Sequence, residues 1–578
     1  MPFTDSFILL SGMLVAVSIL ATVPADRSGV PLLVVFLGVG MVAGADGLGG
    51  VSFESVADAH LVGTAALAVI LFDGGLHTPF ASFRTGLWPG LAMATAGVLV
   101  TAAVTAVAGV VLFGLDWGPA ALLAAMVSST DAAAVFYLLR ARGIEVHARV
   151  RNTLEIESGV NDPLAIFLTL ALTLWLAPGP GGTAVDLALM LVRQIAFGAA
   201  AGLGGGWLLT ALINRLRLAP SLYPLLALAG GLTVYGAAAV AGGSGFLAAY
   251  LAGLIVGNRA STARGGIRRF HDGMAWLCQI GLFLLLGLLV EPTRLLPVAA
   301  EALGLAAVLI VLARPLATLV CLLPLRFEPR QIAFMSWTGL RGAVPIVLSL
   351  FPLIAGVDQA EALFNRVFFI VLVSLLVQGW TVSPLARRLG LIIPRRHPAM
   401  DRVDLTRPKG HELVTCVLPA GAPAVQGCVA DLDLPAGVRV LAVIRRGEPV
   451  AAEPELPLQA GDQLYLLLPG HSPALEERFQ HWVDTVATAR DDAEQAYFGE
   501  FTVAADAPMS AFAAMYLGGD AAGAGPAESV GAFVRRRLRH QASEGDSVRV
   551  GGVMLTVREM EGERITQIGV RLPRRGRG

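Results

Sequence analysis

Lysine and cysteine are scarce in this chain of 578 residues, and its net charge is close to zero. Lys409 is the only lysine, and the formal net charge of -1 argues against nucleic acid as a partner. The four cysteines have neither zinc-site nor disulfide-framework spacing. These absences exclude a disulfide scaffold and a basic surface for nucleic acid.

Hydrophobic residues, by contrast, make up 55% of the chain and the mean hydropathy is positive, which excludes an ordinary soluble protein. Residues 1–390 hold 19 acidic side chains and 21 arginines, whereas the remaining 188 residues hold 24 acidic and 21 basic ones. The composition therefore predicts a membrane domain over 1–390, a linker over 391–404 and soluble domains after it. The first apolar run, near 7–23, has no basic residue before it and no clear cleavage site, which favours a retained helix over a signal peptide.

Thirteen apolar runs are candidates for membrane spans, which need about 20 residues each. They lie near 6–24, 30–45, 60–78, 86–114, 118–139, 152–177, 184–213, 220–241, 244–259, 273–290, 297–324, 330–353 and 362–388. We therefore expect a polytopic α-helical membrane protein with about thirteen transmembrane helices.

The arginines of the predicted loops gather on one side of the membrane. Sixteen lie in the loops that follow odd-numbered spans, whereas only Arg294 and Arg366 lie in the opposite loops. Because short cytoplasmic loops carry the excess of arginine and lysine, we expect an extracytoplasmic amino terminus and a cytoplasmic tail. The expected location is the inner membrane of a bacterial cell, in contact with lipid.

Charged side chains also lie inside predicted spans, where a carboxylate costs on the order of 2.5–3.5 kcal/mol to insert. Asp131, Asp162 and Arg341 each lie nine to eleven residues from an arginine at the cytoplasmic flank. At the rise of an α-helix this is roughly 13–17 Å, about half of a ~30 Å hydrocarbon core. Secondary transporters bind substrates at this depth, where interrupted helices cross.

Each of these three spans has a reason to be interrupted. Pro163 lacks the N–H that would bond to the carbonyl four residues earlier. Two glycines and Pro345 surround Arg341, and three hydroxyl side chains precede Asp131. Freed carbonyls and hydroxyls are hard oxygen ligands that suit an alkali cation.

Helical spacing places the polar groups around Asp162 on two faces. Glu155, Ser158 and Asp162 share one face, which we expect to line the ion route from the cytoplasm. Glu157 and Asn161 share the neighbouring face. The first face is therefore the candidate binding face, and the second is available for an internal ion pair.

We expect that ion pair to join Glu157 to Arg341, buttressed by Asn161. Arg193 and Arg314 also lie inside spans, where charge is retained mainly when it is paired or functional. The sequence leaves open whether these two arginines form structural pairs or act in transport.

Four segments resemble the NhaP-type monovalent cation/proton antiporters. They are Phe72–Leu76 in the third span, Ser129–Asp131 in the fifth, Glu157–Pro163 in the sixth and Gly339–Pro345 in the twelfth. Their order and spacing agree with that family across residues 1–390. The resemblance implies a fold of inverted repeats with interrupted crossing helices, an elevator-like core and a homodimer.

The resemblance also implies roles for the polar side chains. The cation- and proton-binding set would be Asp162, Asp131, Ser158 and the Thr130 backbone carbonyl, with the alkali cation as the only metal. Glu157 and Arg341 would form the supporting pair, and Asn161 is associated with electroneutral one-for-one exchange. Asp73 stands where glutamate is common in the family, and like Glu155 and Arg314 it has either a structural role or one in the ion route.

Competition for Asp162 would suffice for antiport. Burial favours the neutral form of this carboxyl, whereas a bound cation favours the charged form. Only a loaded, charge-compensated site should cross the barrier, because moving a bare carboxylate through a medium of low dielectric constant is costly. Exchange of cation for proton follows without any additional gate.

After residue 396 the apolar pattern gives way to short β-like runs, which predict a cytoplasmic α+β regulatory tail. The runs lie at Glu412–Leu418, Val438–Ile444, Gln463–Leu468, Met554–Val557 and Ile565–Val570, with a hairpin turn at Arg445–Glu448 and a loop near 519–529. Residues 405–485 resemble the TrkA-C domain, and residues 496–573 resemble the CorC/HlyC transporter-associated domain. The tail has no Walker-type loop, so we expect no ATP hydrolysis there. We also expect no cofactor. The tail is then either a site for a nucleotide or another small ligand, or an assembly module.

An NhaP-like core with these two tail domains is the arrangement of the long-tailed potassium/proton antiporters. The resemblance therefore favours electroneutral exchange that expels potassium in return for protons, in pH and volume homeostasis. The site motifs fit sodium equally, so sodium/proton exchange remains an alternative.

A channel would need a filter sequence, which is missing. An intramembrane aspartyl protease could use Asp131 and Asp162, but no Gly-x-Gly-Asp string accompanies either. We expect a transporter and not an enzyme.

Overall fold

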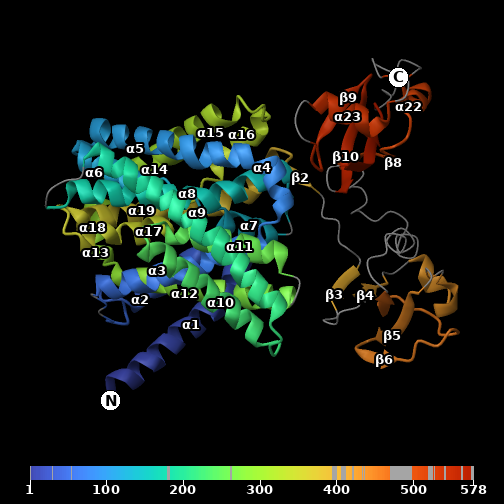
Figure 1. Cartoon of the computed structure of the whole chain (residues 1–578), viewed down its shortest axis with the longest axis horizontal. Coiled ribbons are helices and arrows are strands. Elements are labelled where there is room, and N and C mark those ends of the chain that lie inside the picture. Colours follow the sequence, from blue (N-terminus) through green and yellow to red (C-terminus); the bar gives the residue numbers. More distant parts are fainter. Residues whose placement is uncertain are drawn as a thin grey trace. The chain divides into compact units, whose positions relative to one another are not determined.

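The computed structural model divides the chain into two compact units. One contains Met1–Ile393 with Gln541–Ser543, and the other contains Pro394–His540 with Glu544–Gly578. The first is built mainly of helices, and the second carries two larger β-sheets (Figure 1). The structure describes residues 2–28, 30–51, 53, 55–142, 144–178, 183–260, 263–393, 400–404, 412–418, 422–432, 434, 437–468, 497–517, 525, 528–538, 542–561 and 564–573.

Nine helices of the described residues are long and apolar enough, by length and composition, to cross a membrane. All α-helices of the first unit, short ones included, are α1 (Pro2–Ser28), α2 (Leu32–Ala43), α3 (Val56–His77), α4 (Phe80–Ala92), α5 (Val98–Phe113), α6 (Trp117–Met126), α7 (Ala132–Ala141), α8 (Ala148–Leu176), α9 (Ala184–Arg215), α10 (Leu222–Val240), α11 (Gly245–Arg259), α12 (Arg264–Leu289), α13 (Pro292–Leu295), α14 (Ala299–Val308), α15 (Arg314–Leu322), α16 (Pro329–Trp337), α17 (Val344–Leu348), α18 (Leu350–Ile354) and α19 (Ala360–Arg388) among the described residues. The π-helical turns η1 (Met93–Gly97) and η3 (Leu309–Ala313) join α4 to α5 and α14 to α15. The first unit thus has the composition of a multi-pass membrane domain.

Two of the predicted spans are broken. The run near 118–139 forms α6 and α7, and the run near 330–353 forms α16, α17 and α18. The breaks fall in the segment with hydroxyl side chains before Asp131 and in the glycine-containing segment around Arg341. The interruptions predicted for these two spans are therefore confirmed.

The third interruption, predicted at Pro163, is wrong. α8 continues through this proline as one helix of 29 residues. The proline removes a single hydrogen bond, and α8 packs against α4, α6 and α11. Neighbouring helices of this kind keep a proline-containing helix intact, because the rest of its backbone bonds remain in place.

The same order of elements occurs twice in the first unit. A helix with a π-helical turn, α4–η1–α5, precedes the broken pair α6 and α7, and the long α8 follows. Likewise α14–η3–α15 precedes the broken α16 and α17, and the long α19 follows after α18. This internal repeat places one broken helix in each copy.

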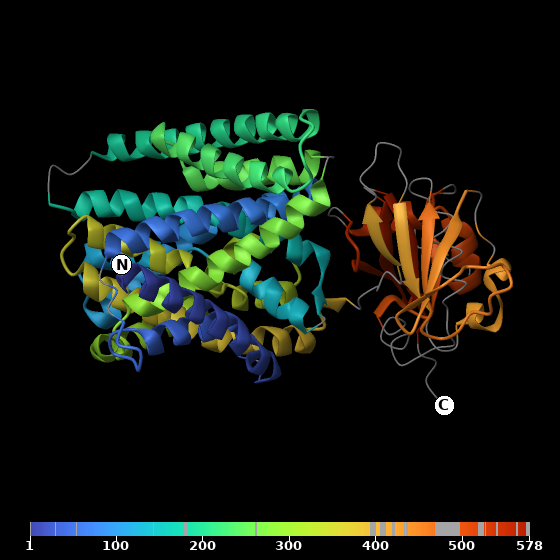
Figure 2. The same ribbon diagram turned by 90° about the horizontal axis from the view of Figure 1, so that it is seen from below.

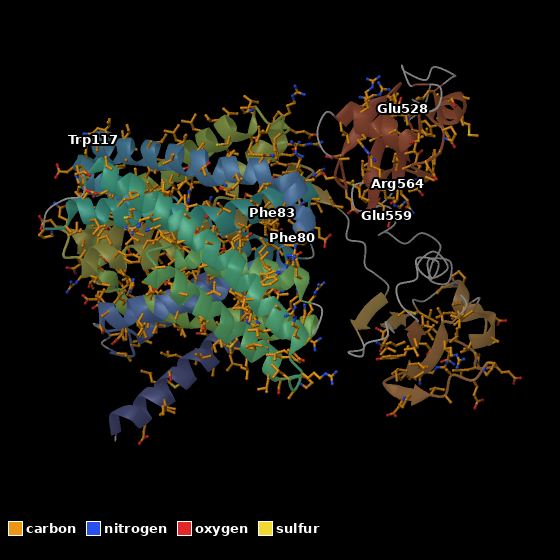
Figure 3. The ribbon with its side chains drawn as sticks, viewed as in Figure 1. Phe80, Phe83, Trp117, Glu528, Glu559 and Arg564 are labelled. Atoms are coloured by element: carbon orange, nitrogen blue, oxygen red, sulfur yellow. The ribbon has the colours of Figure 1, made fainter. Side chains whose placement is uncertain are left out.

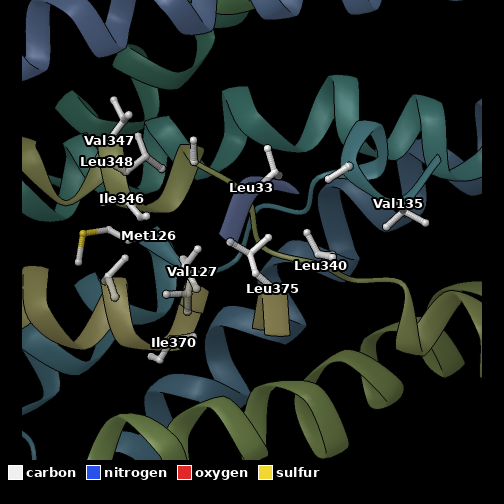
Figure 4. Packing of buried hydrophobic residues seen from close by; sticks show 14 of the residues in the cluster. Leu33, Met126, Val127, Val135, Leu340, Ile346, Val347, Leu348, Ile370 and Leu375 are labelled. Carbon is white, nitrogen blue, oxygen red and sulfur yellow. The ribbon is translucent and has the colours of Figure 1, made fainter. Parts of the chain in front are cut away.

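Fully buried apolar side chains surround the broken helices. Figure 4 shows Met126 and Val127 at the end of α6, Leu340 in the segment after α16, and Ile370 and Leu375 of α19. Packing at this density resists small displacements, because each side chain would lose contacts on moving. The broken ends are therefore held at defined positions.

Glycines let α3 and α11 pack closely. A Cβ atom at Gly253 would lie 2.1 Å from the carbonyl oxygen of Phe72, and one at Gly75 would lie 2.2 Å from that of Tyr250. Small residues allow this approach between helices in a membrane. The contact fixes the position of α3, which carries Asp73, against α11.

One amide side chain joins the ends of α3, α4 and α11. Asn258 Nδ2 donates a hydrogen bond to the Thr78 carbonyl (2.8 Å), and Asn258 Oδ1 accepts one from the N–H of Phe80 (2.9 Å). Phe80 is the first residue of α4 (Figure 3). The short connection from α3 to α4 is thereby held against α11.

The five-stranded sheet of the second unit has the order β3-β4-β7-β5-β6 and is antiparallel. Its strands are β3 (Met400–Asp404), β4 (Glu412–Val417), β5 (Arg439–Arg445), β6 (Glu448–Val450) and β7 (Gln463–Leu468). The three predicted runs in this region are thus β4, β5 and β7. The predicted hairpin is also confirmed: Arg446 and Gly447 have φ values of 53° and 87°, and a type I′ turn requires positive φ at both positions.

A buried carboxylate links β5 to the turn before β7. Asp462 is fully buried, and its two oxygens accept hydrogen bonds from Arg445 Nε and Nη2, each at 2.8 Å. The N–H of Gln459 donates a further bond at 2.8 Å. Burial alone would raise the pKa of Asp462, but these bonds outweigh it and lower the pKa. The stabilisation is therefore present at neutral pH and is lost as the pH falls through the lowered pKa.

The four-stranded sheet has the order β8-β11-β10-β9 and is also antiparallel. Figure 2 draws the strands of the second unit as arrows. It contains β8 (Phe501–Ala504), β9 (Ser547–Val550), β10 (Val553–Glu561) and β11 (Arg564–Arg571), and the helices of this region are α22 (Met509–Tyr516) and α23 (Val530–Leu538). The runs predicted at 554–557 and 565–570 lie inside β10 and β11. The loop predicted near 519–529 lies largely outside the described residues.

Candidate functional site

The backbone between α6 and α7 meets the backbone between α16 and α17. The N–H of Asp131 donates a hydrogen bond to the carbonyl of Leu340 at 2.8 Å. A Cβ atom at Gly342 would lie 2.2 Å from Asp131 Oδ2, so only glycine leaves room for this carboxylate. The two interrupted spans therefore contact each other at Asp131, as the sequence predicted.

Local hydrogen bonds orient Asp131 and attach α8 to it. Asp131 caps α7, with its Oδ1 accepting from the N–H of Ala134 at 3.0 Å. Ser158 Oγ of α8 donates to the carbonyl of Thr130 (3.1 Å) and accepts from the N–H of Ala132 (3.2 Å). Ser158 thus ties α8 to the non-helical segment on both sides of Asp131.

Asp162 lies one helical turn after Ser158 on the same face of α8. Its side chain is 5% exposed, and its Oδ1 has no hydrogen-bond partner among the residues that the structure describes. A cavity of about 310 Å³ is lined by Asp162, Asp131, Ser158 and Thr130 together. The four predicted binding residues therefore share one cavity, which also extends to Glu155 and Asp73.

The predicted ion pair between Glu157 and Arg341 is wrong. Glu157 instead accepts a bidentate pair of hydrogen bonds from Arg314, with the Nη2–Oε2 bond at 2.9 Å. Both side chains are almost fully buried, at 1% and 3% exposure. Arg314 follows the π-helical turn η3, and its planar guanidinium matches the two carboxylate oxygens.

Arg341 has a different partner. Its Nη1 donates to the carbonyls of Ser128 (2.6 Å) and Ser129 (2.5 Å), which follow the last turn of α6. The last carbonyls of a helix carry partial negative charge and lack partners within the helix. Arg341 therefore binds backbone carbonyls after the end of α6 instead of a carboxylate, and the residue is 1% exposed.

Asn161 also acts through a neighbour. Its Nδ2 donates to the hydroxyl of Thr130 at 2.7 Å, and that hydroxyl lies 3.4 Å from Glu157 Oε1. The predicted support of the ion pair by Asn161 is therefore indirect. A chain of contacts runs from Arg314 through Glu157 and Thr130 to Asn161, next to Asp162.

Three further ionisable residues line the cavity although the sequence did not predict them as part of the site. Asp272 and Arg140 line it, and so does His77. Asp272 lies just before the predicted apolar run at 273–290, whereas α12 begins nine residues before that run, at Arg264. The spacing of Asp73 and His77, four residues apart on one helix, was a signal that could have paired them. Arg193, in contrast, is exposed on α9.

Known protein families match nearly the whole chain. The transmembrane sodium/hydrogen exchanger family matches residues 13–388, the TrkA-C domain matches 413–479, and the transporter associated domain matches 494–574. The K(+)/H(+) antiporter NhaP2 of Shewanella sp. (strain ANA-3) is 40% identical over 574 residues, 98% of each chain. The K(+)/H(+) antiporter NhaP of Alkalimonas amylolytica is 40% identical over 567 residues, 96% of each chain.

A solved structure shows the same membrane fold. The sodium proton antiporter MjNhaP1 from Methanocaldococcus jannaschii superposes with a TM-score of 0.59 at 20% identity, over 67% of this chain and 99% of that one. The broken helices that cross, the acidic side chains beside them and these matches define a secondary transporter. The chain belongs to the sodium/hydrogen exchanger family, with TrkA-C and transporter associated domains after its membrane domain.

Proposed function

We propose that this protein is a monovalent cation/proton antiporter that expels cytoplasmic potassium in return for protons. The observation that carries the proposal is the shared cavity, which brings the carboxylates of Asp162 and Asp131 and the hydroxyl of Ser158 beside a broken helix. Relatives with the same domains over their full length bear the name K(+)/H(+) antiporter. Potassium is therefore the proposed transported cation.

Asp162 is the proposed exchange group. Its Oδ1, free of hydrogen bonds among the described residues, is available to a cation or a proton. Asp131 and the Thr130 carbonyl supply further oxygens from the segment between α6 and α7, and Ser158 supplies one from α8. An alkali cation takes such oxygen ligands from interrupted helices. One exchangeable carboxylate next to the neutral Asn161 supports electroneutral one-for-one exchange.

The proposed arrangement places the protein in the bacterial inner membrane as a homodimer. Loop arginines support an extracytoplasmic amino terminus and a cytoplasmic tail. The cavity then opens toward the cytoplasm, since Arg140 and Glu155, which line it, lie toward the arginine-rich ends of α7 and α8. The proposed activity is transport without enzymatic chemistry or a resident cofactor. The two tail domains are proposed to regulate transport, and the candidate regulatory ligand is a nucleotide or another small molecule.

Ion selectivity tests the proposal directly. Everted vesicles that contain the protein should lose a preformed proton gradient when potassium is added, and rubidium should act similarly. Fluorescence dequenching of a pH-sensitive dye measures this response. Dequenching by sodium but not potassium would support sodium/proton exchange, which the same oxygen ligands permit. No response to any alkali cation would overturn antiport.

A further inference from the structure

A mixed cluster of two carboxylates and one imidazole lies in the cavity wall, apart from Asp131 and Ser158. Asp73 and His77 are four residues apart on α3, and Asp272 faces them from α12. His77 Nδ1 lies 3.3 Å from Asp73 Oδ1, and His77 Nε2 lies 3.3 Å from Asp272 Oδ1. All three side chains line the cavity that contains Asp162.

The spacing of these groups fits one metal ion. One ligand atom from each residue can be chosen so that all three atoms lie within 4.8 Å of one another. Nitrogen and oxygen ligands bind zinc at about 2.0–2.2 Å, so two ligand atoms of one ion lie up to about 4.3 Å apart. The 4.8 Å limit on the three ligand atoms exceeds that separation by about half an ångström.

Two further observations point to a cation. Asp73 Oδ1 is buried and accepts no hydrogen bond among the described residues, although it faces His77. The nearby Arg268 donates the hydrogen bonds of its Nη2 to the carbonyls of Leu76 and Gly257, at 3.1 Å each, and not to either carboxylate.

The excess of carboxyl groups along the cavity wall also favours binding of a cation. The carboxyl groups along its wall outnumber its guanidinium groups. They belong to Asp73, Asp131, Glu155, Asp162 and Asp272, against Arg140. A cavity lined by one sign of charge concentrates ions of the opposite sign.

We infer that Asp73, His77 and Asp272 bind a divalent transition-metal cation of the zinc class, and that this cation inhibits exchange. Imidazole with carboxylates suits zinc, nickel or cobalt, whereas magnesium keeps its water ligands and alkali cations prefer oxygen alone. A divalent ion at this place adds two positive charges to the route toward Asp162 and repels potassium. The inhibition rests on the proposed function, whereas metal binding does not.

Zinc alone is the probe for both parts. In everted vesicles, zinc should inhibit potassium-dependent dequenching, a chelator should reverse the inhibition, and magnesium should have no effect. His77→Gln and Asp272→Asn should each raise the zinc concentration for half-inhibition at least about tenfold, because each removes a ligand. Asp116→Asn, an exposed acid before α6, is the matched control and should respond as the wild type.

Direct binding separates this inference from the proposed function. Purified full-length protein in detergent should compete with a chromophoric zinc chelator for zinc, and His77→Gln should weaken this binding at least about tenfold. Equal zinc binding and equal inhibition in wild type and both variants would overturn the metal site. Failure of wild-type vesicles to exchange any alkali cation without zinc would instead overturn the proposed function.

Discussion

Asp162→Asn should abolish cation-dependent proton movement, leaving the background of vesicles without the protein. Asparagine has nearly the same shape as aspartate, so the packing of α8 should persist. It can neither release a proton nor supply a negative charge to a cation. Because the proposed mechanism lets both ions use this one carboxylate, the loss should be complete and should not depend on pH. Dequenching in everted vesicles between pH 6 and 9 measures it.

Glu155→Gln provides the matched control for that variant. Glu155 lies on the same helix face and lines the same cavity, but it is outside the proposed ligand set. Its neutralisation should weaken the apparent potassium affinity and leave the maximal rate measurable. Potassium-driven proton movement that survives in the Asp162→Asn protein would refute the assignment of the exchange group.

Glu157→Gln should destabilise the membrane domain by about 3–5 kcal/mol, because it leaves the Arg314 guanidinium buried without its counter-ion. The bidentate contact and the almost complete burial of both groups are the reasons for this large effect. The measurement is the midpoint of thermal unfolding of the detergent-solubilised protein. Activity should fall as well, since Glu157 contacts the Thr130 hydroxyl beside the cavity.

Two double variants separate Arg314 from Arg341 as the partner of Glu157. Glu157→Gln with Arg314→Gln removes both buried charges and should recover part of the lost stability. Glu157→Gln with Arg341→Gln should be less stable than either single variant, because Arg341 binds the carbonyls of Ser128 and Ser129. Recovery in the second pair and not in the first would contradict the contacts described above.

Hydrophobic runs and local residue types were sufficient to predict much of the architecture. Hydroxyl side chains before Asp131 and glycines around Arg341 predicted both breaks, because such residues favour interruption inside apolar helices. The hairpin at Arg445–Glu448 was predictable from its turn residues, since Gly447 accepts positive φ without strain. Helical spacing alone placed Ser158 and Asp162 on one face.

Side-chain partners between helices were less predictable. Depth along the membrane placed Arg341 level with Asp131 and Asp162, but it gave no direction for the arginine side chain, and Arg314 reaches Glu157 from another span. Pro163 satisfied the local rule for a break, yet packing of α8 against its neighbours keeps the helix continuous. Asp272 was missed because the polar first turns of α12 lack the apolar pattern that marks a span.

The central claim is that potassium and protons compete for Asp162, and the pH dependence of exchange tests it most directly. The half-maximal pH on the acidic side of the activity profile should be measured in everted vesicles at several potassium concentrations. By mass action, each tenfold rise in potassium should lower that pH by about one unit, as one cation replaces one proton. A half-maximal pH that stays constant across the potassium range would contradict competition at a shared carboxylate.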